Sequence, residues 1–167
     1  MSTKEFEKKL DAVQERLGAE FCDRGLLQLA LTHTSYRPEQ DPKKTNNNQR
    51  LEYLGDAVLE WVIIEFLLKK FPEDPGKARR YKGLLVSNNL LGKIAARDLR
   101  LGEVMLFDQN QQVSDKAAAD AFEALIGAIY LDQGLGACRL VVDAYLHARL
   151  TQFIAEDGVS RRERRRR

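Results

Sequence analysis

The stretch SDKAAADAFEALIGAIYLD, residues 114–132, decides the fold of this 167-residue chain. Between positions 117 and 131 its only charged residues are Asp120 and Glu123, and the other positions are apolar or glycine on every side. A helix with this pattern is typically packed inside a core. The stretch therefore predicts a buried central helix that carries two acids.

The two acids lie on one side of this predicted helix. At 100° per residue, Asp120 and Glu123 share a stripe with Gly127, Tyr130 and Leu131. A solvated face would not continue into glycine, tyrosine and leucine. The stripe therefore argues against an ordinary exposed position for the two carboxylates.

A second predicted helix, residues 49–70, repeats the pattern. Its acids Glu52 and Asp56 are four residues apart and share their stripe with Leu59 and Ile63. Here too, acids begin a stripe that is otherwise apolar.

A glycine lies beside the acids in each of the two helices. Gly55 and Gly127 lie in helix interiors, where glycine costs about 1 kcal/mol relative to alanine. Small residues allow two helices to approach closely. If the helices cross at these faces, four carboxylates converge, and neither segment offers a matching cluster of Lys or Arg.

Converging acids of this kind favour a divalent metal site. Buried carboxylates are costly unless they are paired, protonated or bound to metal. A histidine three residues after an acid would indicate di-iron, but Ile126 follows Glu123 and Gly55 follows Glu52 at that spacing. All-oxygen ligation favours Mg²⁺ or Mn²⁺, and such sites commonly activate water against phosphate esters. The alternative is that each acid pair is a surface or salt-bridged pair.

The rest of the chain predicts further helices, because no segment shows the period-two alternation of a strand. We expect an all-α domain of six to eight helices over residues 1–155, followed by a basic, disordered tail over residues 156–167. The other expected helices cover residues 2–17, 26–33, 77–99 and 137–155.

Charge alone does not indicate a nucleic-acid partner. The net charge is +2, but the last seven residues, RRERRRR, carry six Arg and one Glu, so residues 1–160 sum to −3. With 44% apolar and 31% charged residues, the composition is that of an ordinary globular domain.

The sequence predicts a cytoplasmic protein without a membrane span. Its longest apolar run, residues 57–68, contains Glu60 and Glu65, whereas a span needs about twenty mostly apolar residues. The N-terminus is charged and amphipathic, unlike a signal peptide. Cys22 and Cys138 form no CxxC motif, so we expect two small core residues in a reducing compartment.

Four stretches resemble motifs of the ribonuclease III family, in the family's order and spacing over about residues 5–155. NNNQRLEYLGDAVL (46–59) resembles the family signature, and ADAFEALIGAIYLDQG (119–134) resembles its second acidic motif. LLQLALTHTSY (26–36) resembles the N-terminal motif, and LLVSNNLLGKIA (84–95) fits the segment between them.

The resemblance implies a homodimeric endonuclease domain for double-stranded RNA, with a metal site in each subunit and each subunit cutting one strand. Glu52, Asp56, Asp120 and Glu123 match the four metal-site acids of the family. Tyr53 matches an aromatic residue that inserts into the partner subunit. The products would carry 5′-phosphate and 3′-hydroxyl ends with short 3′ overhangs.

Three features depart from the family pattern. Gln49 stands where bacterial members usually have Glu, and Pro75 stands where an accessory acid is common. Neither is one of the four principal acids, so the departures concern RNA positioning or the dimer contact. The sequence also ends where many members continue into a double-stranded RNA-binding domain, so the protein either lacks that domain or is a piece of a longer chain.

Basic residues in three places are candidate RNA contacts, and one of these is the Arg tail at residues 161–167, for which a disordered end is the alternative. Around Tyr81 these are Lys77, Arg79, Arg80 and Lys82, for which a solvated helix end is the alternative. Lys116, four residues before Asp120, matches a lysine of the family's eukaryotic branch and is a candidate for a phosphate contact or a simple helix-start cation. His33, in the THTSY motif, is expected to be a hydrogen-bonded core residue on a helix.

Two other functions compete with the Mg²⁺-dependent ribonuclease. A non-catalytic RNA-binding or ribosome-associated relative would be expected to lose acids at the metal site, yet all four are present. An all-α nucleotide pyrophosphohydrolase also uses acid pairs on helices, but its usual glutamates separated by two residues are not reproduced at Glu52 and Asp56.

Overall fold

The described residues form the predicted all-α domain. The computed structural model describes residues 3–37, 46–108 and 112–164, and these contain seven α-helices, a short π-helical segment and a 3₁₀ turn. In chain order the elements are α1 (Thr3–Leu17), α2 (Arg24–Ala30), α3 (Gln49–Lys70), α4 (Pro75–Leu85), α5 (Asn88–Lys93), η1 (Ile94–Asp98), η2 (Leu101–Glu103), α6 (Asp115–Gln133) and α7 (Leu135–Arg164).

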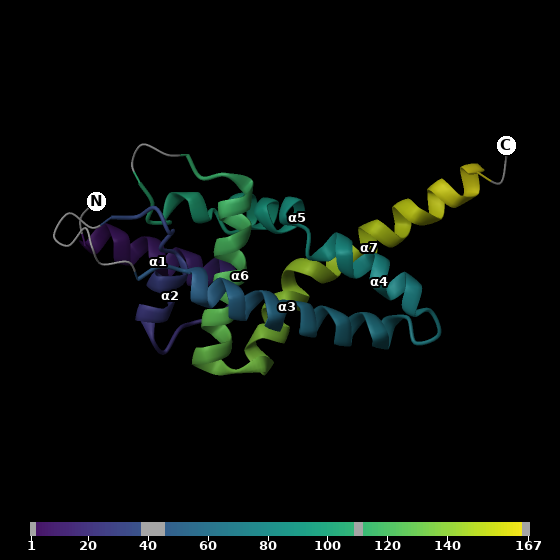
Figure 1. The fold of residues 1–167 in the computed structure, drawn as a ribbon, viewed down its shortest axis with the longest axis horizontal. Coiled ribbons are helices and arrows are strands. Elements are labelled where there is room, and N and C mark those ends of the chain that lie inside the picture. Colours follow the sequence, from purple (N-terminus) through teal and green to yellow (C-terminus); the bar gives the residue numbers. More distant parts are fainter. Residues whose placement is uncertain (1–2, 38–45, 109–111, 165–167) are drawn as a thin grey trace.

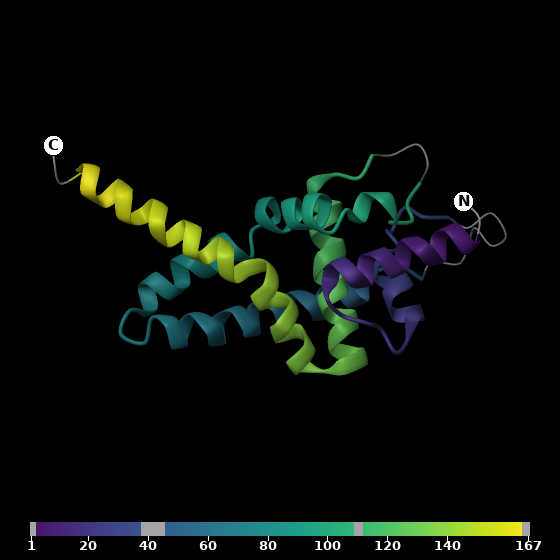
Figure 2. The same cartoon turned by 180° about the vertical axis from the view of Figure 1, so that it is seen from behind.

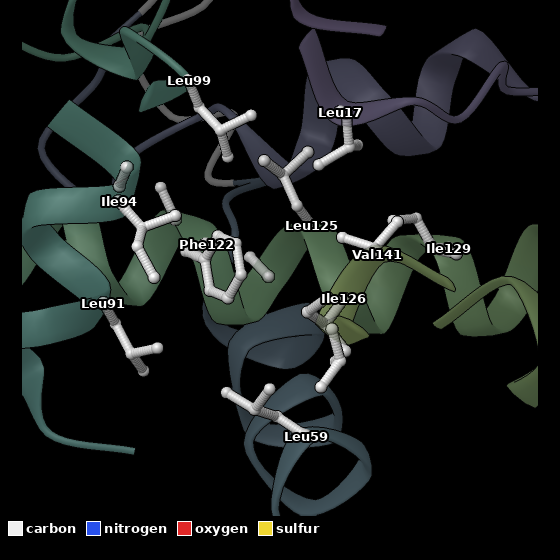
Figure 3. Close-up of a cluster of buried hydrophobic side chains, with 14 of the residues drawn as sticks. Leu17, Leu59, Leu91, Ile94, Leu99, Phe122, Leu125, Ile126, Ile129 and Val141 are labelled. Carbon is white, nitrogen blue, oxygen red and sulfur yellow. The ribbon is translucent and has the colours of Figure 1, made fainter. Parts of the chain in front are cut away.

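Helix α6 is the central helix, as its sequence predicts. It lies in the middle of the domain, with the other helices around it (Figure 1, Figure 2). Every residue of positions 118–129 except Asp120 is buried. Figure 3 shows Phe122, Leu125 and Ile126 of α6 among side chains from neighbouring helices, such as Leu59 of α3. The hydrophobic core is thus built around the segment that also carries two of the acids.

Backbone contact between α3 and α6 fixes their crossing. A Cβ atom on Gly55 would lie 1.7 Å from the carbonyl oxygen of Glu123, and one on Gly127 would lie 2.2 Å from that of Leu51. No side chain fits at either position while the backbones keep this distance. The prediction that small residues bring the two helices close together is confirmed.

Helix α2 is shorter than the sequence suggests. Asp23 caps it as expected, accepting a hydrogen bond from the Gly25 amide, but it ends at Ala30. The chain then pairs with a distant segment, because the His33 amide donates to the Leu106 carbonyl at 2.8 Å. The prediction that His33 lies on a helix is therefore wrong. Its half-buried ring instead makes a 2.8 Å hydrogen bond between Nδ1 and Ser35 Oγ.

The expected helix over residues 77–99 is broken into several pieces. Helix α4 ends at Leu85, and Ser87 takes an extended conformation (φ −71°, ψ 137°) that begins α5. The Ser87 side chain accepts a hydrogen bond from the Leu90 amide, so it acts as the new N-cap. Gly92 lets α5 approach α6, since a Cβ atom there would lie 2.5 Å from the Asp115 carbonyl oxygen.

Helix α7 continues past the expected end at residue 155, up to Arg164. It crosses α4, and its later turns then extend away from the rest of the domain (Figure 1, Figure 2). Asp157 holds the two helices together by accepting hydrogen bonds from Arg80 and from Tyr81 Oη, the latter at 2.9 Å. The backbone of the predicted tail is thus helical up to residue 164, and residues 165–167 lie outside the described residues. The domain boundary at residue 155 stays a prediction.

The two cysteines lie in different surroundings. Cys138 is buried in the core as expected, but Cys22 is exposed, so its prediction as a core residue is wrong. Cys22 belongs to a turn before α2, and its backbone amide donates to Asp132 at 2.8 Å. None of the helices in the described ranges is both long and apolar enough to cross a membrane.

Candidate metal centre

Three of the four predicted acids meet where α3 crosses α6. Glu52, Asp120 and Glu123 each offer a carboxylate oxygen, and these oxygens lie within 4.8 Å of one another. Glu52 comes from α3 and the other two come from α6, about seventy residues later in the sequence. Gly55 packs against the backbone of Glu123 itself. The close approach of the two helices therefore also sets where the acids lie.

The fourth acid, Asp56, lies at the outer edge of this cluster. It is exposed and is not among the three acids whose oxygens lie together. Its negative charge nevertheless raises the pKa of both Glu52 and Glu123. Asp56 therefore acts electrostatically on the cluster from the solvent side.

The acids destabilise one another's charged forms. Glu123 is buried, with only 9% of its surface exposed. Burial is the main cause that raises the pKa of Glu123 to about 7, and the charges of Asp56 and Asp120 add to it. Burial and the charge of Asp120 also raise the pKa of Glu52. The cluster thus holds more negative charge than its surroundings compensate.

Lys116 is the one cation that acts on these carboxylates within the described part of the chain. Its Nζ donates to both carboxylate oxygens of Asp120, at 2.9 and 2.7 Å. This hydrogen bond is the main cause that raises the pKa of Lys116, and the charges of Glu52 and Glu123 contribute as well. A single lysine thus acts on the three acids whose oxygens lie together.

The donor set fits a hard divalent cation. Carboxylate oxygens are the ligands that Mg²⁺, Mn²⁺ and Ca²⁺ prefer, and the group of three contains neither histidine nor cysteine. A dication would offset the excess negative charge that raises the pKa values of Glu52 and Glu123. The crossing of α3 and α6 is therefore a site suited to a metal ion.

Most of the predicted RNA contacts on α4 are engaged within the protein. Lys77 Nζ lies 4.7 Å from the centre of the Phe71 ring. Arg80 pairs with Asp157, and Lys82 pairs with Glu60. Arg79 is exposed and forms no ion pair with the described side chains. The structure therefore leaves Arg79 as the α4 cation best able to meet an external anion.

Helix α3 exposes four large apolar residues, of which only Tyr53 was expected from the sequence. Tyr53, the predicted dimer contact, is 84% exposed. Trp61, Ile64 and Leu68 are also exposed, and their helical spacing places them on the same side of α3 as Tyr53. Their spacing in the sequence was the available signal, but an apolar run in a long helix is more often a core face.

Comparison with known proteins agrees with this architecture. A sequence model described as Ribonuclease-III-like matches residues 23–150. The chain is 43% identical over 133 residues to ribonuclease 3 of Pelotomaculum thermopropionicum, covering 76% of this chain and 55% of that protein. It is 39% identical over 151 residues to ribonuclease 3 of Chloroflexus aggregans, covering 86% of this chain and 66% of that one.

A solved structure shows the same fold. The nuclease domain of ribonuclease III from Campylobacter jejuni superposes with a TM-score of 0.76 at 34% identity, over 83% of this chain and 96% of that one. That structure is described as flexible in a region involved in dimer formation.

Fold and site together define an all-helical domain with an acid cluster at its central helix crossing. The chain belongs to the ribonuclease-III-like family. It spans 55% and 66% of the lengths of the two curated relatives above.

Proposed function

We propose that this chain is a metal-dependent endonuclease domain that cleaves phosphodiester bonds of double-stranded RNA during RNA processing. The observation that carries the proposal is the approach of three carboxylates from two distant segments to within 4.8 Å. Family membership supports it, because the relatives are named ribonuclease 3. The expected products have 5′-phosphate and 3′-hydroxyl ends.

The proposed ligands of the cation are Glu52, Asp120 and Glu123, with Asp56 as the fourth acid of the site. Mg²⁺ is the proposed cofactor, with Mn²⁺ able to replace it. The ion would polarise the phosphoryl group and lower the pKa of attacking water. The protein holds the carboxylates together before any ion arrives. Because the pKa of Glu123 is raised to about 7, ion binding at slightly acidic pH would also release a proton from this residue.

We infer that two copies of the chain act together, each cutting one strand of the duplex. The exposed ring of Tyr53 supports this inference, because it extends from α3 one residue after the ligand Glu52. Replacing Tyr53 with Lys should shift the protein from dimer to monomer in sedimentation experiments. An unchanged dimer would contradict the role of this contact. The cytoplasmic location stays a prediction from the sequence.

The direct test is cleavage of a perfect RNA duplex in Mg²⁺, comparing wild type with Glu123→Gln and Asp56→Asn. Loss of a metal ligand should lower the rate at least about a hundredfold, and the more distant Asp56 should show the smaller loss. Glu65→Gln is a matched control, because Glu65 lies on α3 in ion pairs with Lys69 and Arg139, outside the acid cluster.

Unchanged cutting by both acid variants would contradict the proposed roles. Duplex binding with no turnover in Mg²⁺ or Mn²⁺ would support the non-catalytic alternative. Release of pyrophosphate from a nucleoside triphosphate would support the pyrophosphohydrolase.

A further inference from the structure

Lys116 is placed against the usual electrostatic preferences of a helix. It is the second residue of α6, and the N-terminal end of a helix favours negative rather than positive charge. It also precedes its partner Asp120 by four residues, and this order is the weaker one for an i, i+4 ion pair. Local helix stability therefore does not explain a cation here.

The acid cluster does explain it. Lys116 Nζ contacts both oxygens of Asp120, and the charges of Glu52 and Glu123 also act on it. Without this ammonium group, the carboxylates of Glu52, Asp120 and Glu123 would lie together with no cation on them among the described residues. Lys116 thus stabilises the cluster when no metal is present.

The same contact obstructs metal binding. Asp120 is one of the three acids whose oxygens lie within 4.8 Å, and both of its oxygens are hydrogen-bonded to Lys116. A cation that binds Asp120 therefore meets oxygens that already accept hydrogen bonds from this ammonium group. The ammonium group and a dication also repel each other at this distance.

We propose that Lys116 is an internal counter-ion that competes with the divalent cation for Asp120 and so weakens metal binding. The inference rests on the proposed metal site and concerns how tightly that site binds its ion. The Lys116 side chain is 67% exposed, whereas that of Asp120 is 17% exposed. Lys116 is therefore the member of the pair with solvent around it into which it can turn, whereas Asp120 is mostly enclosed.

Titration calorimetry with Mn²⁺ on the full chain tests the competition. Lys116→Met should bind Mn²⁺ about tenfold more tightly than wild type, because an exposed ion pair and a nearby like charge are both removed. Lys116→Arg keeps the charge and should stay within about twofold of wild type. Lys69→Met is the matched control, since Lys69 forms an i, i+4 pair with Glu65 outside the cluster.

Thermal melting gives a second readout that does not depend on activity. In EDTA, Lys116→Met should melt below wild type, because the acids have lost their cation. Its rise in melting temperature on adding Mn²⁺ should exceed that of wild type. Lys116→Gln should show the same two changes and serves in case the Met variant folds poorly.

The outcomes separate the two proposals. If wild type binds Mn²⁺ and Glu123→Gln does not, but Lys116→Met binds no more tightly than wild type, the competition is wrong and the metal site stands. If neither wild type nor Lys116→Met binds Mn²⁺, the proposed metal site is wrong and the competition falls with it.

Discussion

The crossing of α3 and α6 and the outer face of α4 are both rich in charge, but they handle it in opposite ways. On α4, Arg80 and Lys82 each have an acidic partner. At the crossing, Glu52, Asp120 and Glu123 share Lys116 as their cation among the described residues. Charges that are already paired mainly hold helices together, whereas a buried charge without a partner is costly until it takes up a proton or binds an ion of opposite charge. The acids at the crossing are therefore the group suited to a cation, whereas the paired charges of α4 mainly join it to neighbouring helices.

The largest expected effect comes from separating the two helices. In Gly55→Ala the new methyl group would meet the Glu123 carbonyl oxygen at 1.7 Å, so we expect a loss of about 3 kcal/mol or more in unfolding free energy. Mn²⁺ binding should be lost as well. Gly83→Ala on α4 is the control, because its methyl group meets nothing within 4 Å and should stabilise by up to about 1 kcal/mol. Urea denaturation measures both, and equal effects would contradict the backbone contact.

A second effect of nearly this size depends on pH. The pKa of Glu123 rises from 4.5 to about 7 on folding, so the folded protein binds the extra proton between these values. The metal-free protein therefore loses stability as the pH rises through this range, by roughly 3 kcal/mol from this group.

Glu123→Gln removes that dependence. In EDTA at pH 8 the variant should be more stable than wild type, and the difference should shrink toward pH 4.5. With Mn²⁺ present the order should reverse, since only wild type gains from the ion. Equal stabilities of the two proteins at both pH values would contradict the raised pKa of Glu123.

On the α4 side, Tyr81→Phe removes the hydrogen bond to Asp157 while keeping the buried ring. We expect a loss of about 1 kcal/mol in unfolding free energy, because Asp157 retains Arg80 as a partner. Mn²⁺ affinity should not change. A large drop in Mn²⁺ affinity would mean that the α4–α7 contact and the acid cluster are coupled.

The smallest effect should distinguish the cations of α4 from one another. Arg79→Gln should lower the slope of log affinity for duplex RNA against log salt by about 1, as expected when one phosphate contact is lost. Lys82→Gln should leave the slope unchanged, because Lys82 pairs with Glu60. Filter binding in Ca²⁺ over a series of salt concentrations measures both. Equal slopes for wild type and both variants would remove α4 from the RNA-binding surface.

The parts of the molecule that follow from local pattern could be predicted from the sequence. An apolar segment interrupted only by Asp120 and Glu123 has few places in a fold other than the centre, and α6 is there. Gly55 and Gly127 indicated a close approach because glycine is otherwise costly inside a helix. The bounds of α3, Gln49–Lys70, also follow from the sequence.

Features that depend on distant partners could not be predicted in this way. The end of α2 is set by pairing between Thr32 and Leu106, which no local pattern indicates. The prediction of a solvated or RNA-binding α4 left out Asp157 and Glu60, because both are far away in the sequence. The apolar stripe of α6 also suggested that Tyr130 and Leu131 are buried, but both are exposed where α6 leaves the core.

Gly55 and Gly127 let the backbones of α3 and α6 touch. Main-chain atoms therefore set the distance between the two helices from which the carboxylates extend. The length and the rotamer of each acidic side chain then set where its carboxylate lies. Shortening Glu52 to Asp would withdraw its carboxylate by about 1.5 Å, one carbon–carbon bond, while the helices stayed where they are. A protein built in this way can change the size of ion that it accepts by single methylene steps without altering its fold.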